Sequence, residues 1–297
     1  MRKILLTFLS LLLVSINLFS AIDFTDVDNL YVMDMIDQSK SILDSQLKTA
    51  SNNNDKSEIY WRLSRTEISL GDKSESDSEK LKHFKLGLDY ANKSIDLNDN
   101  FNAHLWKSSN IGRIGQTQGI LKSLSAAENM RDDLRIVLDD FNALDSSETW
   151  YVLGTLYTSV PGGFISFGNK NYGISYYRIA VDTIADNVVY PNHYKALATA
   201  LYDRNWDKAK RNKEFKKMNS NWKKNTKPYD KYAFYEGQDS GKNTPYYSSV
   251  SLNKMSDRQE AVMLLNYAIA KFNVWPSHSE SEELAIEEIK TLKSQWT

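Results

Sequence analysis

Large aromatic residues recur along this chain at a nearly constant interval, and this period constrains the fold most. Trp61, Trp106, Trp150 and Tyr194 are separated by 45, 44 and 44 residues. Each follows a turn rich in Asn, Asp or Ser, whose side chains accept hydrogen bonds from the free amides at the start of a helix. We therefore expect each aromatic residue to open a helix. Such a period is typical of repeat proteins, whose units bury their apolar faces only against their neighbours.

The apolar residues between these positions have helical spacing. From Leu81 to Ile95, and again from Ile120 to Phe141, they step by three and four, which gathers them on one face of a helix. Only five prolines occur among the 297 residues, and none precedes Pro161, so long helices can form. The chain is predicted to be all-α. Each aromatic opener should have a partner helix, at 81–97, 120–144, 172–185 and 206–218.

The segment around Trp150 carries the strongest repeat signal. Trp150, Leu153, Gly154 and Tyr157 stand in the order typical of the first helix of a tetratricopeptide repeat. The small Gly154 should let the partner helix approach, while Trp150 and Tyr157 fill the space on either side. Each unit is about ten residues longer than the ordinary period of about 34. We predict a right-handed α-solenoid of degenerate helix pairs of this kind.

The N-terminal segment 1–21 has the composition of a secretory signal peptide. Arg2 and Lys3 precede a short apolar run that ends in Ser20-Ala21, where we expect cleavage. The run is shorter than the roughly 20 residues of a spanning helix, and no later stretch approaches that length. The mature protein is expected to be exported, into the periplasm, without a membrane span. Retention of the segment as an uncleaved anchor is the alternative.

Composition divides the rest of the chain into four parts. Between residues 208 and 227 lies a basic run, which we interpret as a solvated helix face. The aromatic residues that follow it are expected to fold back over the solenoid and close its groove. The predicted parts are an N-terminal helix (22–56), the repeat domain (57–219), an irregular segment rich in aromatic residues and Lys (220–256), and a capping pair of helices (257–297).

Three glycines, Gly112, Gly115 and Gly119, are expected to break the helix between the second pair. Arg113 and Lys122 flank the start of the next helix, where free amides and the helix dipole favour anions. The glycines lack the strand and the Gly-Lys-Ser/Thr ending of a phosphate-binding loop. Close helix packing is the structural interpretation of this segment. A site for an anionic ligand or an acidic peptide is the functional one.

The segment from Val160 to Lys170 contains three glycines, a proline and two phenylalanines. Such a composition predicts a tightly folded loop, in which glycine takes backbone angles closed to other residues. An elaborated turn between two helices is one interpretation. The other is a lid or clamp on the concave face, with polar groups aimed at a ligand or partner. The candidate residues of this loop are Gly163, Phe164, Ser166, Phe167, Gly168 and Asn169.

Three motifs together resemble a known family. They are Ala-His-Leu-Trp at 103–106, Gly-Arg-Ile-Gly-x-x-x-Gly-Ile-Leu-Lys-Ser-Leu at 112–124, and Trp-x-x-Leu-Gly-x-Leu-Tyr at 150–157. They are similar to the tetratricopeptide-like domain of regulator-of-microtubule-dynamics proteins, and the loop at 161–169 resembles that of exported bacterial relatives. The resemblance covers about 57–219. It implies an interaction module without known catalytic residues, and we do not carry microtubule association over to an exported chain.

Composition and motifs argue against several other functions. Lys and Arg number 37 against 38 Asp and Glu, so there is no general basic surplus for nucleic acid. Cysteine is absent and the four His are far apart, and no catalytic, cofactor or metal motif is recognised.

We expect a non-enzymatic module that binds a peptide or protein, such as a periplasmic transport component, in its concave groove. Trp106, Arg113, Lys122, Trp150 and the loop are the candidate groove residues. The alternative is a periplasmic component that binds a small apolar or anionic ligand and assists solute transport.

Overall fold

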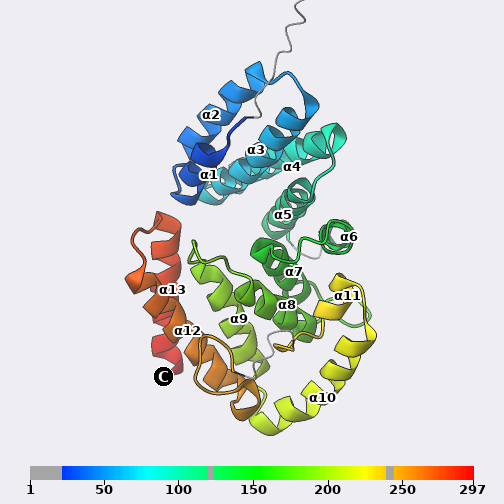
Figure 1. The fold of residues 1–297 in the computed structure, drawn as a ribbon, viewed down its shortest axis with the longest axis vertical. Coiled ribbons are helices and arrows are strands. Elements are labelled where there is room, and N and C mark those ends of the chain that lie inside the picture. The colour runs from blue at the N-terminus through cyan, green and yellow to red at the C-terminus, as the bar shows by residue number, and fades with distance from the viewer. Residues whose placement is uncertain (1–21, 120–122, 239–243) are drawn as a thin grey trace, which may run out of the picture.

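The protein is described by a computed structural model, which covers residues 22–119, 123–238 and 244–297. The signal-like segment 1–21 lies outside these described residues. Within them the fold is all-helical, as predicted, and consecutive helices pack side by side (Figure 1). The helices are α1 (Thr25–Val32), α2 (Ile36–Thr49), α3 (Asn53–Lys73), α4 (Asp77–Leu97), α5 (Phe101–Gln118), α6 (Leu124–Asp139), α7 (Ser147–Ser159), α8 (Lys170–Asp182), α9 (Pro191–Arg204), α10 (Lys208–Lys224), α11 (Pro228–Tyr232), the 3-10 helix η2 (Leu252–Lys254), α12 (Asp257–Val274) and α13 (Glu280–Trp296).

Asx and Ser side chains start most of these helices, as the turn composition predicts. Asn100 caps α5 by accepting a hydrogen bond from the amide of Ala103, and Ser146 caps α7 in the same way through Thr149. The aromatic residues differ in their distance from these caps. Trp150 lies in the first turn of α7, but Trp61 lies deep inside α3, whose cap is Asn52. The four aromatic residues therefore recur in every second helix from α3 to α9, but they do not all open a helix.

The N-terminal part contains two helices where the sequence predicted one. Helix α1 ends at Val32, and Asp34 takes the left-handed conformation with φ of 61° before α2 begins. This turn lets α1 fold back, so that Val27 packs with Leu43 of α2 in one apolar cluster. The position of the turn at Asp34 therefore agrees with the contact between Val27 and Leu43, and no proline or glycine marks it in the sequence.

Helix α5 runs unbroken through Gly112 and Gly115, so the predicted break there is wrong. The helix ends at Gln118, and Gly119 has a positive φ of 96°. A Cβ atom on Gly112 would lie 2.9 Å from the terminal methyl of Met130, and one on Gly115 would lie 3.2 Å from Cβ of Ser123. These glycines serve close approach between α5 and the start of α6.

The fourth predicted pair is also different. Helix α9, which carries Tyr194, packs along α12 rather than along α10. Helix α12 offers α9 a broad apolar surface that includes Leu264, Leu265 and Ala268, all of which are fully buried. Helix α10 instead contacts α11 and η2 at the edge of the molecule. The segment 205–256 is therefore an insertion between two helices that pack against each other directly.

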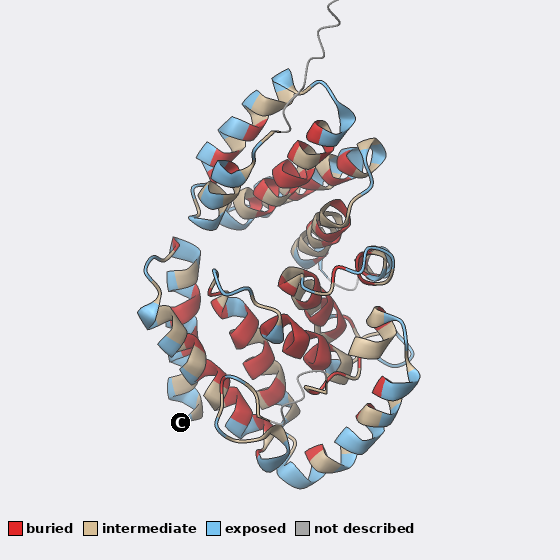
Figure 2. Ribbon diagram, viewed as in Figure 1, coloured by how far each residue is buried: buried red, intermediate tan, exposed pale blue. Residues whose placement is uncertain are grey.

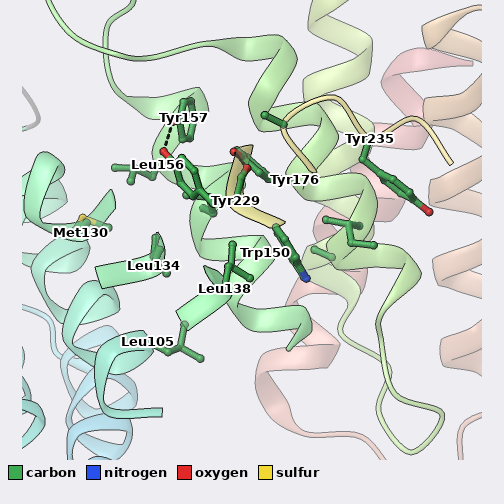
Figure 3. Close-up of a cluster of buried hydrophobic side chains, with 14 of the residues drawn as sticks. Leu105, Met130, Leu134, Leu138, Trp150, Leu156, Tyr157, Tyr176, Tyr229 and Tyr235 are labelled. Carbon is green, nitrogen blue, oxygen red and sulfur yellow. Dashed lines mark hydrogen bonds between the residues drawn. The ribbon is translucent and has the colours of Figure 1, made fainter. Parts of the chain in front are cut away.

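Buried side chains follow the inner faces of the helix stack (Figure 2). The largest cluster surrounds Trp150, which is fully buried and donates a hydrogen bond from Nε1 to the carbonyl of Leu144 at 2.9 Å. Tyr176 of α8 stacks on Trp150, and the hydroxyl groups of Tyr157 and Tyr229 are hydrogen-bonded to each other (Figure 3). Aromatic residues from the inserted segment thus complete the core of the third unit.

A buried ionic network ties the inserted segment to the stack. Glu260 of α12 accepts hydrogen bonds from Arg178 of α8 and, at 2.7 Å, from Arg211 of α10. Asp257 accepts from Arg204 of α9 at 2.8 Å. Burial opposes ionisation of Glu260, yet the charges of Arg178 and Arg211 hold its pKa at about 2. Three helices therefore depend on carboxylates at the start of α12.

Candidate functional site

The principal concave feature is a groove of about 890 Å³. Its floor is formed by α3, α5 and α7, together with the start of α6. The turn between α1 and α2 closes one end, and the segments 187–193 and 275–282 close the other. Figure 1 shows these two ends facing each other across the inner side of the stack. The aromatic residues of the lining are Tyr31, Trp106, Tyr151, Tyr190 and Trp275.

Helix α5 contributes the centre of the floor. Trp106 is half-buried, and it lines the groove nearly two turns before Gly112 and Arg113. Arg113 donates a hydrogen bond to Asp72 of α3 at 2.7 Å, and both side chains are 41% exposed. An ion pair as exposed as this contributes little to stability, because water and salt screen it. Arg113 therefore remains able to exchange Asp72 for a carboxylate of a bound partner.

Stacked rings form the wall at α7 and α9. The ring of His193 lies between those of Tyr151 and Tyr190, with centroid distances of 4.4 and 4.9 Å and interplanar angles of 15° and 16°. Burial lowers the pKa of His193 to about 3, against the smaller effect of a hydrogen bond to the backbone of Ser147. The imidazole of His193 is therefore uncharged at neutral pH.

Tyr190 has a strained backbone at this wall. Its φ of 48° and ψ of 59° are left-handed, a conformation that costs a non-glycine residue about 1–3 kcal/mol, and Pro191 follows it directly. Its hydroxyl donates a hydrogen bond to Glu148 of α7. Burial and the charge of Glu148 raise its pKa above the usual value, so it stays protonated. Strain of this kind gathers at functional sites, because the surrounding structure must hold it in place.

The opposite wall comes from α1 and α3. The guanidinium carbon of Arg65 lies 3.9 Å from the ring centroid of Tyr31 and its Nη2 lies 2.6 Å from Asp28. Tyr31 also receives a hydrogen bond from the hydroxyl of Ser69 at 3.3 Å. Both tyrosine-bearing walls are thus held by hydrogen bonds or cation–π contacts, which presents the aromatic surface in a fixed position.

Apolar side chains are exposed at both rims. Val32 and Met33 of the α1–α2 turn are 52% and 44% exposed, and Val274 at the end of α12 is 80% exposed. Trp275 follows Val274 and lines the groove. Exposed apolar residues that gather at the mouth of a groove, rather than singly, are typical of interaction surfaces.

The structure places four of the predicted residues at the groove: Trp106, Arg113, Gly112 and Gly115. Lys122 lies outside the described residues. Trp150, also predicted for the groove, is a core residue with no exposed surface. Gly154 packs against the ring of Tyr177, which is the helix contact expected for it.

The loop between α7 and α8 lies outside the groove. Val160 lines the groove, but none of the residues 161–169 does. The amide of Gly168 donates a hydrogen bond to the carbonyl of Pro161 at 3.0 Å, and a Cβ atom on Gly168 would lie 1.9 Å from the carbonyl oxygen of Val160. Gly163 has a positive φ of 72°. Only a glycine at each of these two positions permits this tight fold.

The side chains of this loop have separate roles. Asn169 caps α8 by accepting hydrogen bonds from the amides of Asn171 and Tyr172. Phe167 packs against Tyr157 with a centroid distance of 5.3 Å. Ser166 is half-buried, and Phe164 points fully into solvent.

Several groove residues were missed by the sequence analysis, among them Tyr31, Tyr151, Tyr190, His193 and Trp275. Tyr151 follows the repeat residue Trp150, so helical geometry could have placed it on the adjacent face. The pair Tyr190-Pro191 is a helix start, but no local signal shows that its ring stacks on His193. The contribution of Trp275 depends on α12 packing against α9, which is a contact between distant parts of the chain.

The described lining of the groove contains four acidic residues, Asp34, Asp72, Glu148 and Glu282. Among residues 22–119, 123–238 and 244–297, no group of three or more His, Asp or Glu could hold a metal ion. Each of the four has a partner: Asp72 accepts from Arg113, Glu148 accepts from Tyr190, Asp34 is paired with Lys73, and Glu282 accepts from the amide of Ser279. No described helix has both the length and the apolar character needed to cross a bilayer.

Comparison with protein families supports the resemblance inferred from the motifs. Residues 23–160 match the family described as regulator of microtubule dynamics protein 1-3. The chain is similar to this family from α1 through α7, which includes the floor of the groove and the motifs at 103–106, 112–124 and 150–157. The match begins earlier and ends earlier than the range inferred from those motifs, and it stops before the loop at 161–169. A comparison with curated proteins found no match.

Proposed function

We propose that this protein is a helical interaction module that binds an extended segment of a protein partner in the groove. In this proposal the stack is a right-handed solenoid of degenerate tetratricopeptide-like pairs, with α3, α5, α7 and α9 on the inner side. The observation that carries the proposal is the aromatic groove itself, which joins fixed rings inside to exposed apolar rims outside. Buried aromatic anchors of this kind dominate the energetics of protein interfaces. Similarity to a helical family over residues 23–160 agrees with such a role.

The shape of the groove favours a peptide over a compact ligand. The lining runs from the α1–α2 turn across three inner helices to the α12–α13 connection. Its polar pairs, including Arg113 with Asp72 and Tyr190 with Glu148, are spaced along this path. A partner segment could place apolar side chains against Trp106 and Tyr151 while its polar groups exchange with the Arg113–Asp72 pair.

A small apolar or anionic ligand is the second candidate. The volume of about 890 Å³ falls within the range of small-molecule pockets, roughly 300–1,000 Å³. With this occupant the protein would assist solute transport as a periplasmic component.

Export places either function outside the cytoplasm. We base this on the signal-like composition of segment 1–21 and on the similarity of the loop at 161–169 to that of exported bacterial relatives. The partner would then be a periplasmic protein, such as a component of a transport system.

Site-specific photo-cross-linking in cells tests the interaction directly. A photoreactive residue at Gln116, an exposed lining residue, should give a discrete protein adduct. The same residue at Lys85, exposed on α4 and outside the lining, should not. Equal adducts from both positions, or none from Gln116, would contradict the peptide-binding proposal. Native mass spectrometry of the purified protein would show a co-purified small molecule if the second candidate is correct.

A further inference from the structure

Positive charge is concentrated on the inserted helix α10. Residues 207–227 contain nine Lys or Arg and two acidic residues, although the whole chain has a formal charge of −1. Arg211 is buried in the ionic network, and its neighbours Met218 and Trp222 complete a narrow buried seam. The remaining basic residues of the helix are all lysines. Helix α10 is therefore strongly basic in a chain that is nearly neutral as a whole.

The lysines lie opposite the buried seam. At 100° per residue, the positions facing away from Arg211, Met218 and Trp222 are those of Lys213, Lys216, Lys217, Ser220, Lys223 and Lys224, and all six are exposed. We name these six residues the lysine ridge. With 17 residues α10 is roughly 25 Å long, and the ridge follows its solvent-exposed side.

Few acidic groups neutralise the ridge. Glu214 lies within 3.3 Å of Lys217 and within 3.0 Å of Lys210, so one carboxylate serves two lysines. Within the described part of the chain, Lys213, Lys216, Lys223 and Lys224 form no ion pair. Lys213 repels Lys217 one turn away, which opposes helix formation. An anionic partner would relieve this repulsion.

A rigid apolar tip lies near the end of this ridge. Phe164 has a relative exposure of 111% and Ile165 one of 66%, at the turn of the α7–α8 loop. The loop is anchored through Phe167, which packs against Tyr157. Tyr157 is in turn hydrogen-bonded to Tyr229 of α11, the helix that follows α10. Figure 1 accordingly shows α11 and the end of α10 on the same edge of the molecule as this loop.

We propose that the lysine ridge and the Phe164–Ile165 tip dock the protein peripherally on an anionic phospholipid bilayer. Lysines beside exposed apolar residues are typical of surfaces that lie in a membrane interface, where the lysines approach phosphates and the apolar groups enter the acyl boundary. None of the ridge residues lines a described pocket, so the ridge offers no groove for an extended peptide. Its exposed cations are lysines, which attract phosphates as point charges, whereas arginine is the residue suited to bidentate recognition of a specific partner. Nucleic acid fits less well, because Phe215, the exposed aromatic residue of α10, lies toward the buried seam and not on the ridge, where it could stack on bases.

Vesicle sedimentation of the full chain tests this proposal. Partitioning is measured on phosphatidylcholine vesicles and on vesicles that contain an equal part of phosphatidylglycerol. The increment due to phosphatidylglycerol measures electrostatic docking. Because Arg2 and Lys3 of segment 1–21 can contribute to it, the ridge is assigned by variants that leave this segment unchanged. We expect a clear increment at low salt that is lost near 0.5 M salt, because the screening length falls to about 4 Å.

Two matched variants test whether the extra binding caused by phosphatidylglycerol depends on the lysine ridge. Replacing Lys213, Lys216, Lys217 and Lys224 by Gln should reduce it at least about tenfold. Replacing Lys48, Lys82, Lys85 and Lys290 by Gln removes the same charge from other exposed sites and should change it less than about twofold. Circular dichroism confirms that both variants remain folded.

The tip is tested separately. Phe164→Ser with Ile165→Ser should weaken binding to anionic vesicles severalfold while its dependence on salt is unchanged. Equal loss in the ridge variant and its control, or no increment in the original chain, would overturn the proposal. A photoreactive residue at Ser220 that captures an acidic protein, without an increment on vesicles, would assign the ridge to a protein partner instead. The groove proposal is independent of all these outcomes.

Discussion

A Cβ atom on Gly154 of α7 would lie 2.5 Å from Cδ1 of Tyr177 of α8. The tyrosine ring cannot move away easily, because its hydroxyl donates a hydrogen bond to Thr155 at 3.0 Å and it is buried. The contact explains why a glycine stands in the middle of a helix, where it is otherwise unfavourable. It also sets the spacing of the two helices that support the groove wall at Tyr151.

Replacing Gly154 by Ala should destabilise the protein by about 1–3 kcal/mol, because the added methyl group overpacks the α7–α8 contact. Gly112→Ala is the matched control. Its Cβ would meet only the flexible end of Met130, and alanine improves helix propensity, so a change below about 1 kcal/mol is expected. Urea unfolding followed by circular dichroism measures both. Equal destabilisation in the two variants would contradict this account of the contact.

Asn169→Ala should destabilise the protein by about 1 kcal/mol, because the start of α8 loses its cap. Ser166→Ala should have almost no effect on stability, since the Ser166 side chain caps no helix. Thermal unfolding of the two variants side by side tests this assignment. If Asn169→Ala melts like the original protein, the capping role is wrong and the residue is available for binding.

Glu260→Gln should destabilise the protein by about 3–5 kcal/mol, because it leaves Arg178 and Arg211 buried without their shared carboxylate. Glu288→Gln is the control. It removes an acid that pairs with Lys195 at the surface and should cost less than about 1 kcal/mol. Denaturant midpoints compare the two.

The same carboxylate predicts a response to acid. The pKa of Glu260 is about 2 in the folded protein, below its ordinary value of 4.5. Its contribution to stability is therefore complete above pH 4.5 and is lost as the pH falls toward 2. Glu260→Gln should flatten the fall in unfolding free energy across this range. An unchanged pH dependence would show that the network is not charged.

The burial of His193 should make the free energy of unfolding sensitive to acid at a higher pH than Glu260 does. Its folded pKa of about 3 lies below the ordinary 6.5, so the unfolded chain binds the proton first. Stability from this residue is complete above pH 6.5 and falls by ~1.4 kcal/mol per pH unit toward pH 3. His193→Phe keeps a ring between Tyr151 and Tyr190, and it should remove this slope. A ring resonance of His193 that titrates near pH 6.5 in nuclear magnetic resonance would contradict the prediction.

The sequence predicted the class of fold because the relevant signals are local. Helical spacing, Asx caps and the interval between Trp61, Trp106 and Trp150 need no knowledge of distant contacts. The α1–α2 turn and the pairing of α9 with α12 were missed for the opposite reason. Both depend on residues far apart in the chain, and the second passes over an insertion of about fifty residues.

The candidate site was predicted less completely than the fold. Trp106 and Arg113 line the groove, since both lie on α5, which forms the centre of its floor. The loop with Phe164 and Ser166 lies elsewhere, because glycine content indicates a tight turn but not the side of the stack on which it lies. The wall of Tyr151, His193 and Tyr190 arises where two helices meet, and no single segment carries its signature.

Binding of the cross-linked partner to matched variants tests the central claim most directly. By isothermal titration calorimetry, Trp106→Ala should weaken the affinity of the partner segment at least about 30-fold, as expected for a buried aromatic anchor. Phe164→Ser changes an aromatic residue outside the groove and should leave the affinity within about twofold, with both variants folded. Unchanged binding by Trp106→Ala together with a large loss in Phe164→Ser would contradict the groove as the site of interaction.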